Sequence, residues 1–197
     1  MVNNIGRIAT IFFIKTIYSF LLAIFCIASA LFFNVNYLLI FPFIPIQITL
    51  IDQFVEGFPP FVLTFERNIK PVEKHFLRRS LLLALPSALM VVFSVLFIRL
   101  WGASHGWSAA DMSTVSYYLL GSIGFLSVIR ACLPLNIWRA LLIVFSVVGF
   151  YASAVVLKNL IEISLLTATT FPVYLALMAI FTGIFILTTI LQKYEFD

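Results

Sequence analysis

Residues 50–67 read LIDQFVEGFPPFVLTFER and place two carboxylates in the middle of an otherwise apolar run. Asp52 and Glu56 are four residues apart, so in a helix they share one face and lie about 6 Å apart along its axis. Two adjacent prolines, Pro59 and Pro60, follow within a turn. The stretch therefore combines two features that membrane helices ordinarily avoid, ionisable side chains and residues that interrupt the helix.

The composition of the whole chain is typical of a membrane protein. Of 197 residues, 63% are hydrophobic and only 10% are charged, whereas about 25% are charged in an average soluble domain. A water-soluble fold of this length could not cover so much apolar surface, so we expect lipid to surround most of the chain. The net charge of +4 is explained by membrane topology and does not indicate nucleic-acid binding.

Six apolar stretches are each long enough to cross the ~30 Å of hydrocarbon in a bilayer as helices. The sequence therefore predicts an all-α membrane protein, a six-transmembrane-helix bundle with both termini cytoplasmic. Residues 1–197 would form a single membrane domain with a cytoplasmic loop at 66–79. The expected spans are 8–33, 37–65, 80–101, 112–131, 137–157 and 166–191.

The orientation follows from the basic residues, which concentrate on the cytoplasmic side of membrane proteins. With both termini cytoplasmic, the outer side holds only Arg99 and Lys158 out of 12 basic residues. The remaining ones, all on the inner side, are Arg7, Lys15, Arg67, Lys70, Lys74, Arg78, Arg79, Arg130, Arg139 and Lys193.

The prolines predict that the second span opens beside its acids. Pro59 has no N–H for the carbonyl of Val55, Pro60 has none for the carbonyl of Glu56, and Gly57 relaxes the backbone further. We expect the helix to open around 55–60 and expose backbone oxygens, which are tolerated at membrane depth only where they face protein or water. Two carboxylates and the Val55 carbonyl would form an oxygen site for a hard cation, with Asp52 and Glu56 as the metal ligands. The alternative is a proline-kinked helix whose acids are protonated and structural.

Lys15, about two turns inside the first span, has two interpretations. Its ammonium either snorkels to the cytoplasmic interface or acts as an internal counter-ion for Asp52 or Glu56 when no cation is bound. Thr16 and Ser19 lie on or near the same helix face, and they would add hydroxyl oxygens to the ion site.

Two segments resemble a known family. VNNIGRIATIFFIKTIYS (2–19) and ITLIDQFVEGFPPFVLTFERN (48–68) are similar to the C-terminal membrane region of P-type (E1–E2) cation-transporting ATPases. The nearest branch is the bacterial calcium- or magnesium-pump-like one of Gram-positive organisms. In that family the fifth membrane helix starts with an Asn-Asn stalk. The sixth carries an acid-Gly-x-Pro break, which Glu56-Gly57-Phe58-Pro59 matches.

The resemblance implies roles for individual residues. Glu56 stands where the family has its ion-binding Asp, and Asp52 stands where calcium pumps have an Asn ligand. Thr16 and Ser19 stand where those pumps have an Asn and a Glu. These two departures imply one ion per cycle or a different ion, with Lys15 taking the place of a second ion.

The resemblance also implies a function, as the membrane portion of an ATP-driven pump in a bacterial plasma membrane. Its transported ion would be a divalent cation such as Ca²⁺ or Mg²⁺. The phosphorylated Asp-Lys-Thr-Gly-Thr loop of the family does not occur in the sequence. Mg-ATP would therefore act only through cytosolic domains that belong, with the first four membrane helices, to the N-terminal part of the pump. This chain alone would not hydrolyse ATP.

The expected partners are accordingly the lipid bilayer and that N-terminal part, with no nucleic acid. The chain would be a split subunit, a truncated gene product or a fragment. Two alternatives remain open, a stand-alone secondary cation carrier or channel and an inactive structural membrane fragment.

Overall fold

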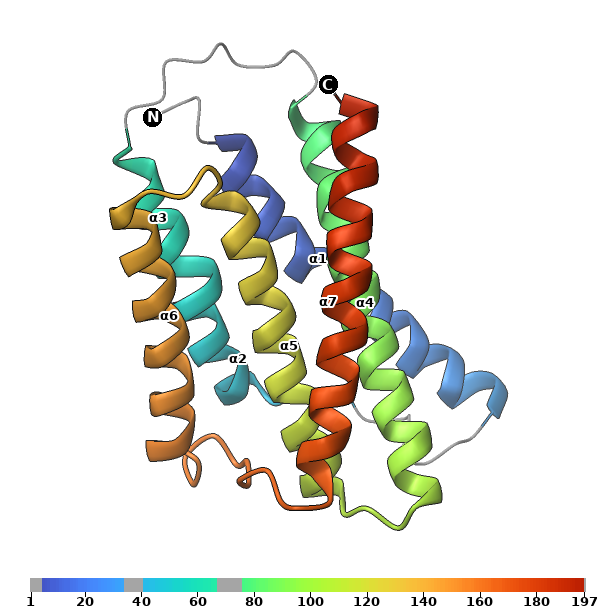
Figure 1. The fold of residues 1–197 in the computed structure, drawn as a ribbon. Helices are drawn as coiled ribbons and strands as arrows, with labels where there is room; N and C mark the ends of the chain where they lie inside the picture. Colours follow the sequence, from blue (N-terminus) through green and yellow to red (C-terminus); the bar gives the residue numbers. More distant parts are fainter. Residues whose placement is uncertain (1–4, 34–40, 67–75, 197) are drawn as a thin grey trace.

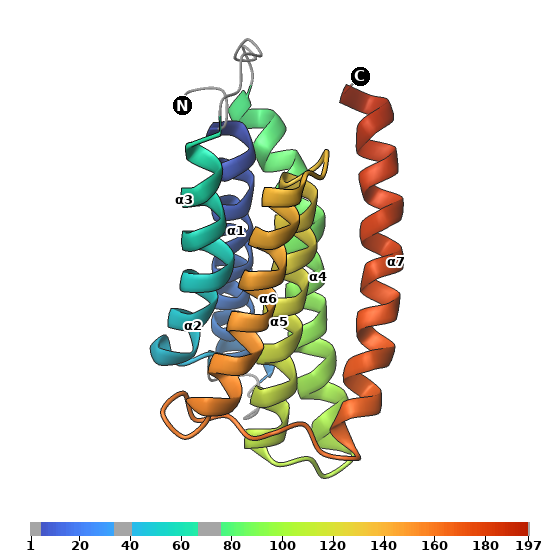
Figure 2. The same ribbon diagram turned by 60° about the vertical axis from the view of Figure 1, so that its left-hand side comes forward.

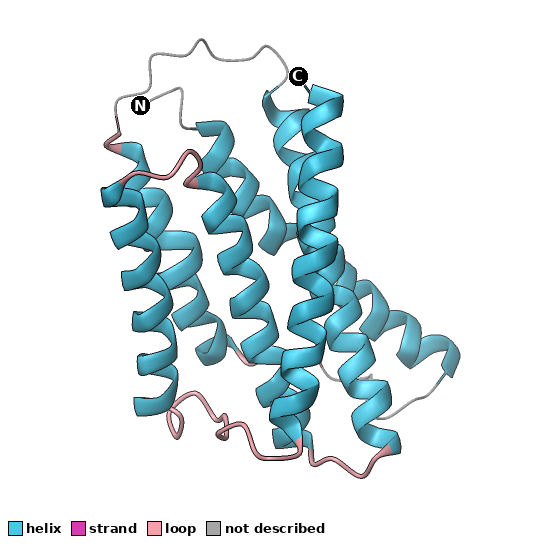
Figure 3. Cartoon of the chain, viewed as in Figure 1, coloured by secondary structure: helices cyan, strands magenta, loops and turns pink. Residues whose placement is uncertain are grey.

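The computed structural model describes residues 5–33, 41–66 and 76–196, and in this part of the chain helices joined by loops are the regular secondary structure (Figures 1 and 3). It contains six helical rods, two of which include π-helical segments. The first rod is α1 (Ile5–Ala28) with η2 (Ser29–Phe33), and the second is α2 (Pro45–Ile51), η4 (Asp52–Gly57) and α3 (Phe58–Thr64). The others are α4 (Phe76–Ser104), α5 (Ala109–Ala131), α6 (Ile137–Val156) and α7 (Thr170–Phe196).

Five helices in the described part are long and apolar enough to cross a membrane, namely Ile5–Leu31, α4, α5, α6 and Thr170–Lys193. The sixth rod is the interrupted helix over residues 45–64. It begins at Pro45, a residue suited to a first helical turn because its missing N–H is not needed there. Of the loop expected at 66–79, residues 67–75 lie outside the described residues, and residues 76–79 instead form the first turn of α4.

The rods run side by side, and α5 lies at their centre. Every residue from 114 to 125 is buried, whereas one side of α7 faces away from the other rods (Figure 2). The start of α1, the start of α4 and the end of α7 share one end of the bundle, as do the end of α3 and the start of α6 (Figure 1). We call this end the Glu66 end, after the last described residue before the gap at 67–75.

Small residues allow the other rods to approach α5 closely. A Cβ on Gly121 would lie 2.5 Å from a ring carbon of Phe150, so α6 can pack here only against a glycine. The serine hydroxyls of α5 join neighbouring helices. Ser127 is 2.9 Å from the Ser87 hydroxyl of α4, and Ser122 is 2.7 Å from the Tyr151 hydroxyl of α6. These contacts fix α5 against α4 and α6, and the interrupted rod in turn packs against α5.

Candidate cation site

The acidic stretch forms a π-helical turn. In η4 the hydrogen bonds reach one residue further than in an α-helix, and the Phe58 N–H donates to the carbonyl of Gln53, five residues back. The sequence predicts an opened stretch at 55–60, but the structure keeps the helix continuous and widens it at 52–57. The physical reason is that an additional residue in the turn lets the chain stay helical although Pro59 and Pro60 cannot donate hydrogen bonds.

Gly57 and the prolines shape the inside of this turn. A Cβ on Gly57 would lie 2.8 Å from the carbonyl oxygen of Asp52, too close for any residue other than glycine without a shift of the backbone. The Val55 carbonyl faces prolines at both positions, 59 and 60, so neither an α-type nor a π-type hydrogen bond is open to it. The loss of a helical hydrogen-bond donor for the Val55 carbonyl therefore stays a prediction from the sequence, and it applies to an α-helical and to a π-helical turn alike.

The two acids meet Lys15 of α1. Lys15 Nζ lies 2.5 Å from Asp52 Oδ1 and 3.6 Å from Glu56 Oε2, so one ammonium bridges both carboxylates. The three side chains differ in burial, with exposed fractions of 8% for Glu56, 34% for Lys15 and 45% for Asp52. The site thus has one enclosed carboxylate and one carboxylate near its rim.

The other residues expected at the site are placed differently. Thr16 is exposed, and its hydroxyl donates to the Phe12 carbonyl of its own helix at 3.2 Å. Ser19 is partly buried. Tyr18, which the sequence did not single out, is 1% exposed and lines the same small cavity as Glu56. Its position three residues after Lys15 was the available signal, because residues at that spacing share a helix face.

Within the described residues, no group of three or more His, Cys, Asp or Glu side chains lies together in a way that would hold a metal ion. The acidic ligands that the described part offers at this site are therefore the two carboxylates of η4. Neighbouring backbone carbonyls are the other oxygen atoms that the turn itself provides.

The packing around η4 fixes the direction of these side chains. A Cβ on Gly124 of α5 would lie 2.8 Å from Val55 Cγ1, and a Cβ on Gly149 of α6 would overlap the ring of Phe54. The π turn is therefore seated on two glycines of neighbouring helices. With Phe54 directed toward α6 and Val55 toward α5, Asp52 and Glu56 are left to face Lys15 of α1.

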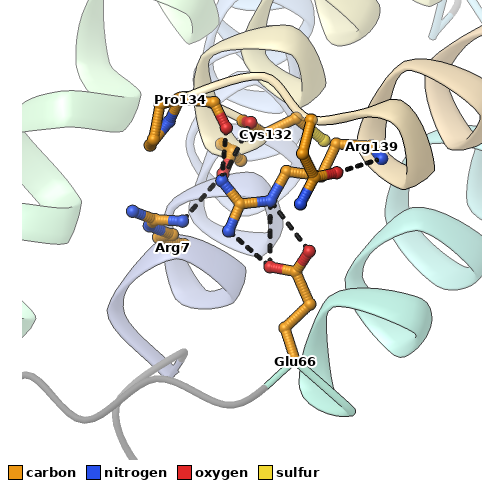
Figure 4. Close-up of polar contacts among 7 residues, drawn as sticks. Arg7, Glu66, Cys132, Pro134 and Arg139 are labelled. Carbon is orange, nitrogen blue, oxygen red and sulfur yellow. Dashed lines mark hydrogen bonds and ion pairs between the residues drawn. The ribbon is translucent and has the colours of Figure 1, made fainter.

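A second ion pair fixes the end of the same rod (Figure 4). Arg139 in the first turn of α6 donates from Nε to both carboxylate oxygens of Glu66, each at 2.9 Å, and from Nη2 to Oε2. Its Nη1 donates to the carbonyls of Pro134 and Cys132, at 2.6 and 3.2 Å. Arg7 of α1 donates to a backbone carbonyl at the end of α5 at 3.4 Å. We call the contact of Glu66 with Arg139 the Glu66–Arg139 clamp.

The clamp has an electrostatic signature. Hydrogen bonds from Arg139 hold the pKa of the Glu66 carboxyl below its ordinary value, and the positive charge of Arg7 acts in the same direction. The sequence did not predict this pair, because its members are 73 residues apart and carry no local motif.

The sequence was compared with known proteins, and two of its relatives are described as cation-transporting ATPases. No protein-family model and no solved structure matches the chain. The chain is 69% identical over 191 residues to a Streptococcus pneumoniae protein described as "Probable cation-transporting ATPase exp7", a match that covers 96% of this chain and 25% of that protein. It is 34% identical over 160 residues to "Calcium-transporting ATPase CtpE" of Mycolicibacterium smegmatis, covering 76% of this chain and 20% of that protein.

These matches cover most of the chain but only a quarter or less of each relative. Together with its helices, they make the chain a multi-pass membrane protein related to bacterial P-type ATPases. The resemblance noted in residues 2–19 and 48–68 is thereby confirmed. The chain is homologous to the C-terminal membrane region of P-type cation-transporting ATPases, and it spans about a quarter of the length of the Streptococcus pneumoniae relative.

Proposed function

We propose that this chain supplies part of the ion-binding and translocation pathway of an ATP-driven cation pump. In this proposal Asp52 and Glu56 bind the transported cation, and the ammonium of Lys15 occupies their site when the cation is absent. The observation that carries the proposal is the position of Lys15 Nζ, 2.5 Å from Asp52 and 3.6 Å from Glu56.

The energetics of the bilayer support a functional role for these three side chains. One ionised acid near the centre of a membrane helix costs at least about 2.5 kcal/mol on insertion scales, and two on one face also repel each other. Lys15 offsets one of the two negative charges, so the group retains a net charge of about −1 if all three are ionised. A divalent cation would neutralise both carboxylates, and the ammonium would then have to leave them.

The oxygen atoms of the π turn suit a hard cation. Two carboxylates offer up to four oxygens, and the Val55 carbonyl lacks both of its possible helical donors. Calcium takes about six to eight oxygen ligands, whereas magnesium takes six and keeps several waters. The remaining ligands would come from water and from the parts of the pump that precede this chain. Calcium is the first candidate, because the CtpE relatives are described as calcium-transporting.

In the complete pump, the energy of phosphorylation would switch this site between access from the two sides of the membrane. We infer from the distribution of basic residues that the Glu66 end faces the cytoplasm. There the clamp would pass movement of the cytosolic domains to the rod that carries the acids. We further propose that the chain resides in a bacterial plasma membrane.

A chimera tests the proposal. The segment of the Streptococcus pneumoniae ATPase that the 191-residue match covers is replaced by this chain, and cation-dependent ATP hydrolysis and uptake into inside-out vesicles are measured. We expect the chimera to be active. We expect Asp52→Asn and Glu56→Gln each to lower the apparent cation affinity about tenfold or more, since each removes a charged ligand.

Glu162→Gln is the matched control, because Glu162 is an exposed acid in the loop between α6 and α7. Full transport in both site variants would contradict the proposal. A carrier function would instead be indicated if the 197-residue chain alone, reconstituted in liposomes, moved cations down a gradient. An inactive chimera that is folded and membrane-inserted would favour the structural alternative.

A further inference from the structure

Beside the acids, a cavity of about 10 Å³ lies among α1, η4, α4 and α5. Its walls are apolar except for two side chains, Tyr18 and Glu56. Both are enclosed by protein, because only 1% of the whole Tyr18 residue and 8% of the Glu56 side chain are exposed. The cavity therefore brings a phenol and a carboxylate together away from bulk water and lipid.

The Tyr18 hydroxyl has no hydrogen-bond partner among the described residues. The Ser19 side chain is a polar neighbour on α1, but the two hydroxyls do not reach hydrogen-bond geometry. Buried hydroxyls are almost always paired, with protein or with ordered water. Glu56 also has acceptor capacity left, because Lys15 Nζ is 3.6 Å from Oε2, which is longer than an ordinary hydrogen bond.

The size and chemistry of the cavity fit one water molecule. A volume of about 10 Å³ is close to the minimum that holds a water, and a buried water needs two to four polar partners. Tyr18 Oη and the Glu56 carboxylate supply two. The Val55 carbonyl is a third candidate, since Val55 also lines the cavity and its helical donors are replaced by prolines.

We propose that one ordered water occupies this cavity and bridges the Tyr18 hydroxyl to the Glu56 carboxylate. Tyr18 is then a positioning residue that holds Glu56 through the water. The second part of the inference rests on the proposed function: when a cation replaces the Lys15 ammonium, this water remains as one of its ligands. A cation that tolerates a water ligand is thereby favoured.

The first test needs neither ATP nor a transported ion. Tyr18→Phe deletes only the hydroxyl, and the thermal unfolding of the 197-residue chain in nanodiscs is compared with that of the unaltered chain. If the water is present, the variant leaves it one partner short, so the unfolding temperature falls. If the cavity is dry, the deletion removes an unpaired buried hydroxyl, and the unfolding temperature stays the same or rises, which overturns the proposal.

Tyr117→Phe is the matched control. The Tyr117 hydroxyl is also buried without a partner among the described residues, but its ring packs against Phe150 rather than beside an acid. We expect this variant to be as stable as the unaltered chain or more so. NMR of the chain with isotope-labelled tyrosine tests directly for a water molecule beside the Tyr18 ring. A water cross-peak at the Tyr18 ring that disappears in Glu56→Leu supports the bridge, and the lack of any cross-peak in the unaltered chain overturns it.

The second test uses the chimeric pump. Tyr18→Phe is expected to raise the cation concentration for half-maximal activity about tenfold, the range found for residues that orient a metal ligand, with little change in maximal rate. An unaltered half-maximal concentration would overturn the role of the water as a cation ligand. If the chimera fails to respond to cations at all, the proposed function fails, while the water itself is still decided by the unfolding and NMR measurements.

Discussion

Replacing Lys15 by methionine tests the central contact of the site while keeping the length of the side chain. At an effective dielectric constant of about 20, charges 2.5 and 3.6 Å apart attract by at most about 7 and about 5 kcal/mol. Desolvation of the ammonium and the partial exposure of Asp52 offset most of this attraction. We therefore expect a net loss of about 2 kcal/mol in the free energy of unfolding, between the values for exposed and buried pairs.

The assay is the unfolding temperature of the purified chain in nanodiscs, measured with and without Ca²⁺ or Mg²⁺. Without divalent cation, we expect Lys15→Met to unfold about 4–8 °C lower than the unaltered chain. With cation, we expect a larger rise for the variant, because the cation no longer competes with an ammonium. Saturation at about 100 times the dissociation constant corresponds to about 2.7 kcal/mol.

Lys158→Met is the control, because Lys158 lies in the loop after α6, away from the acids. If Lys15→Met and Lys158→Met gave the same unfolding temperature and the same response to cations, Lys15 would not be a counter-ion. Its contact with Asp52 would then be incidental to snorkelling.

Two further predictions concern the rod that carries the acids. Gly57→Ala places a Cβ 2.8 Å from the Asp52 carbonyl oxygen. We expect this substitution to lower the free energy of unfolding by about 1–2 kcal/mol in a denaturation series, although alanine ordinarily stabilises a helix relative to glycine. Equal or greater stability would show that the turn has room for a Cβ at this position. Because Arg139 lowers the Glu66 pKa, the clamp is expected to stabilise fully above pH 4.5, the ordinary Glu value, and to weaken as pH falls below it. Glu66→Gln should abolish this part of the acid dependence of the unfolding temperature, and an unchanged pH profile would contradict a stabilising clamp.

The sequence was sufficient to predict the helices and the acidic pair. The apolar runs are long, and the i, i+4 spacing of Asp52 and Glu56 determines a shared face in an α-helical or slightly wider turn. The form of the interruption was not predictable in the same way. Prolines at 59 and 60 remove donors, but the chain can respond by unwinding or by adding a residue to the turn. The choice depends on how Val55 is seated against Gly124.

Contacts between distant segments were also beyond the sequence. Lys15 had two interpretations, because a lysine two turns inside a span can reach either the interface or a neighbouring helix. Which one it adopts depends on the rotation of α1 against η4, which no local pattern fixes. Tyr18 reads as an ordinary apolar-face residue until the cavity beside Glu56 is seen. Glu66 and Arg139 meet only because α3 and α6 end and begin at the same level.

The additional residue in the π turn has a geometric consequence for the rod. Each residue of an α-helix rotates the chain by about 100° and advances it by 1.5 Å. If the turn at 52–57 tightened to α-helical spacing, α2 and α3 would have to rotate relative to each other by about 100° around the helix axis. Because Glu66 is fastened to Arg139, the rotation would fall on the half that begins at Pro45, and Asp52 at the junction would turn with it. A change from π-helical to α-helical hydrogen bonding in this turn would thus point the Asp52 carboxylate in a new direction without bending the rod.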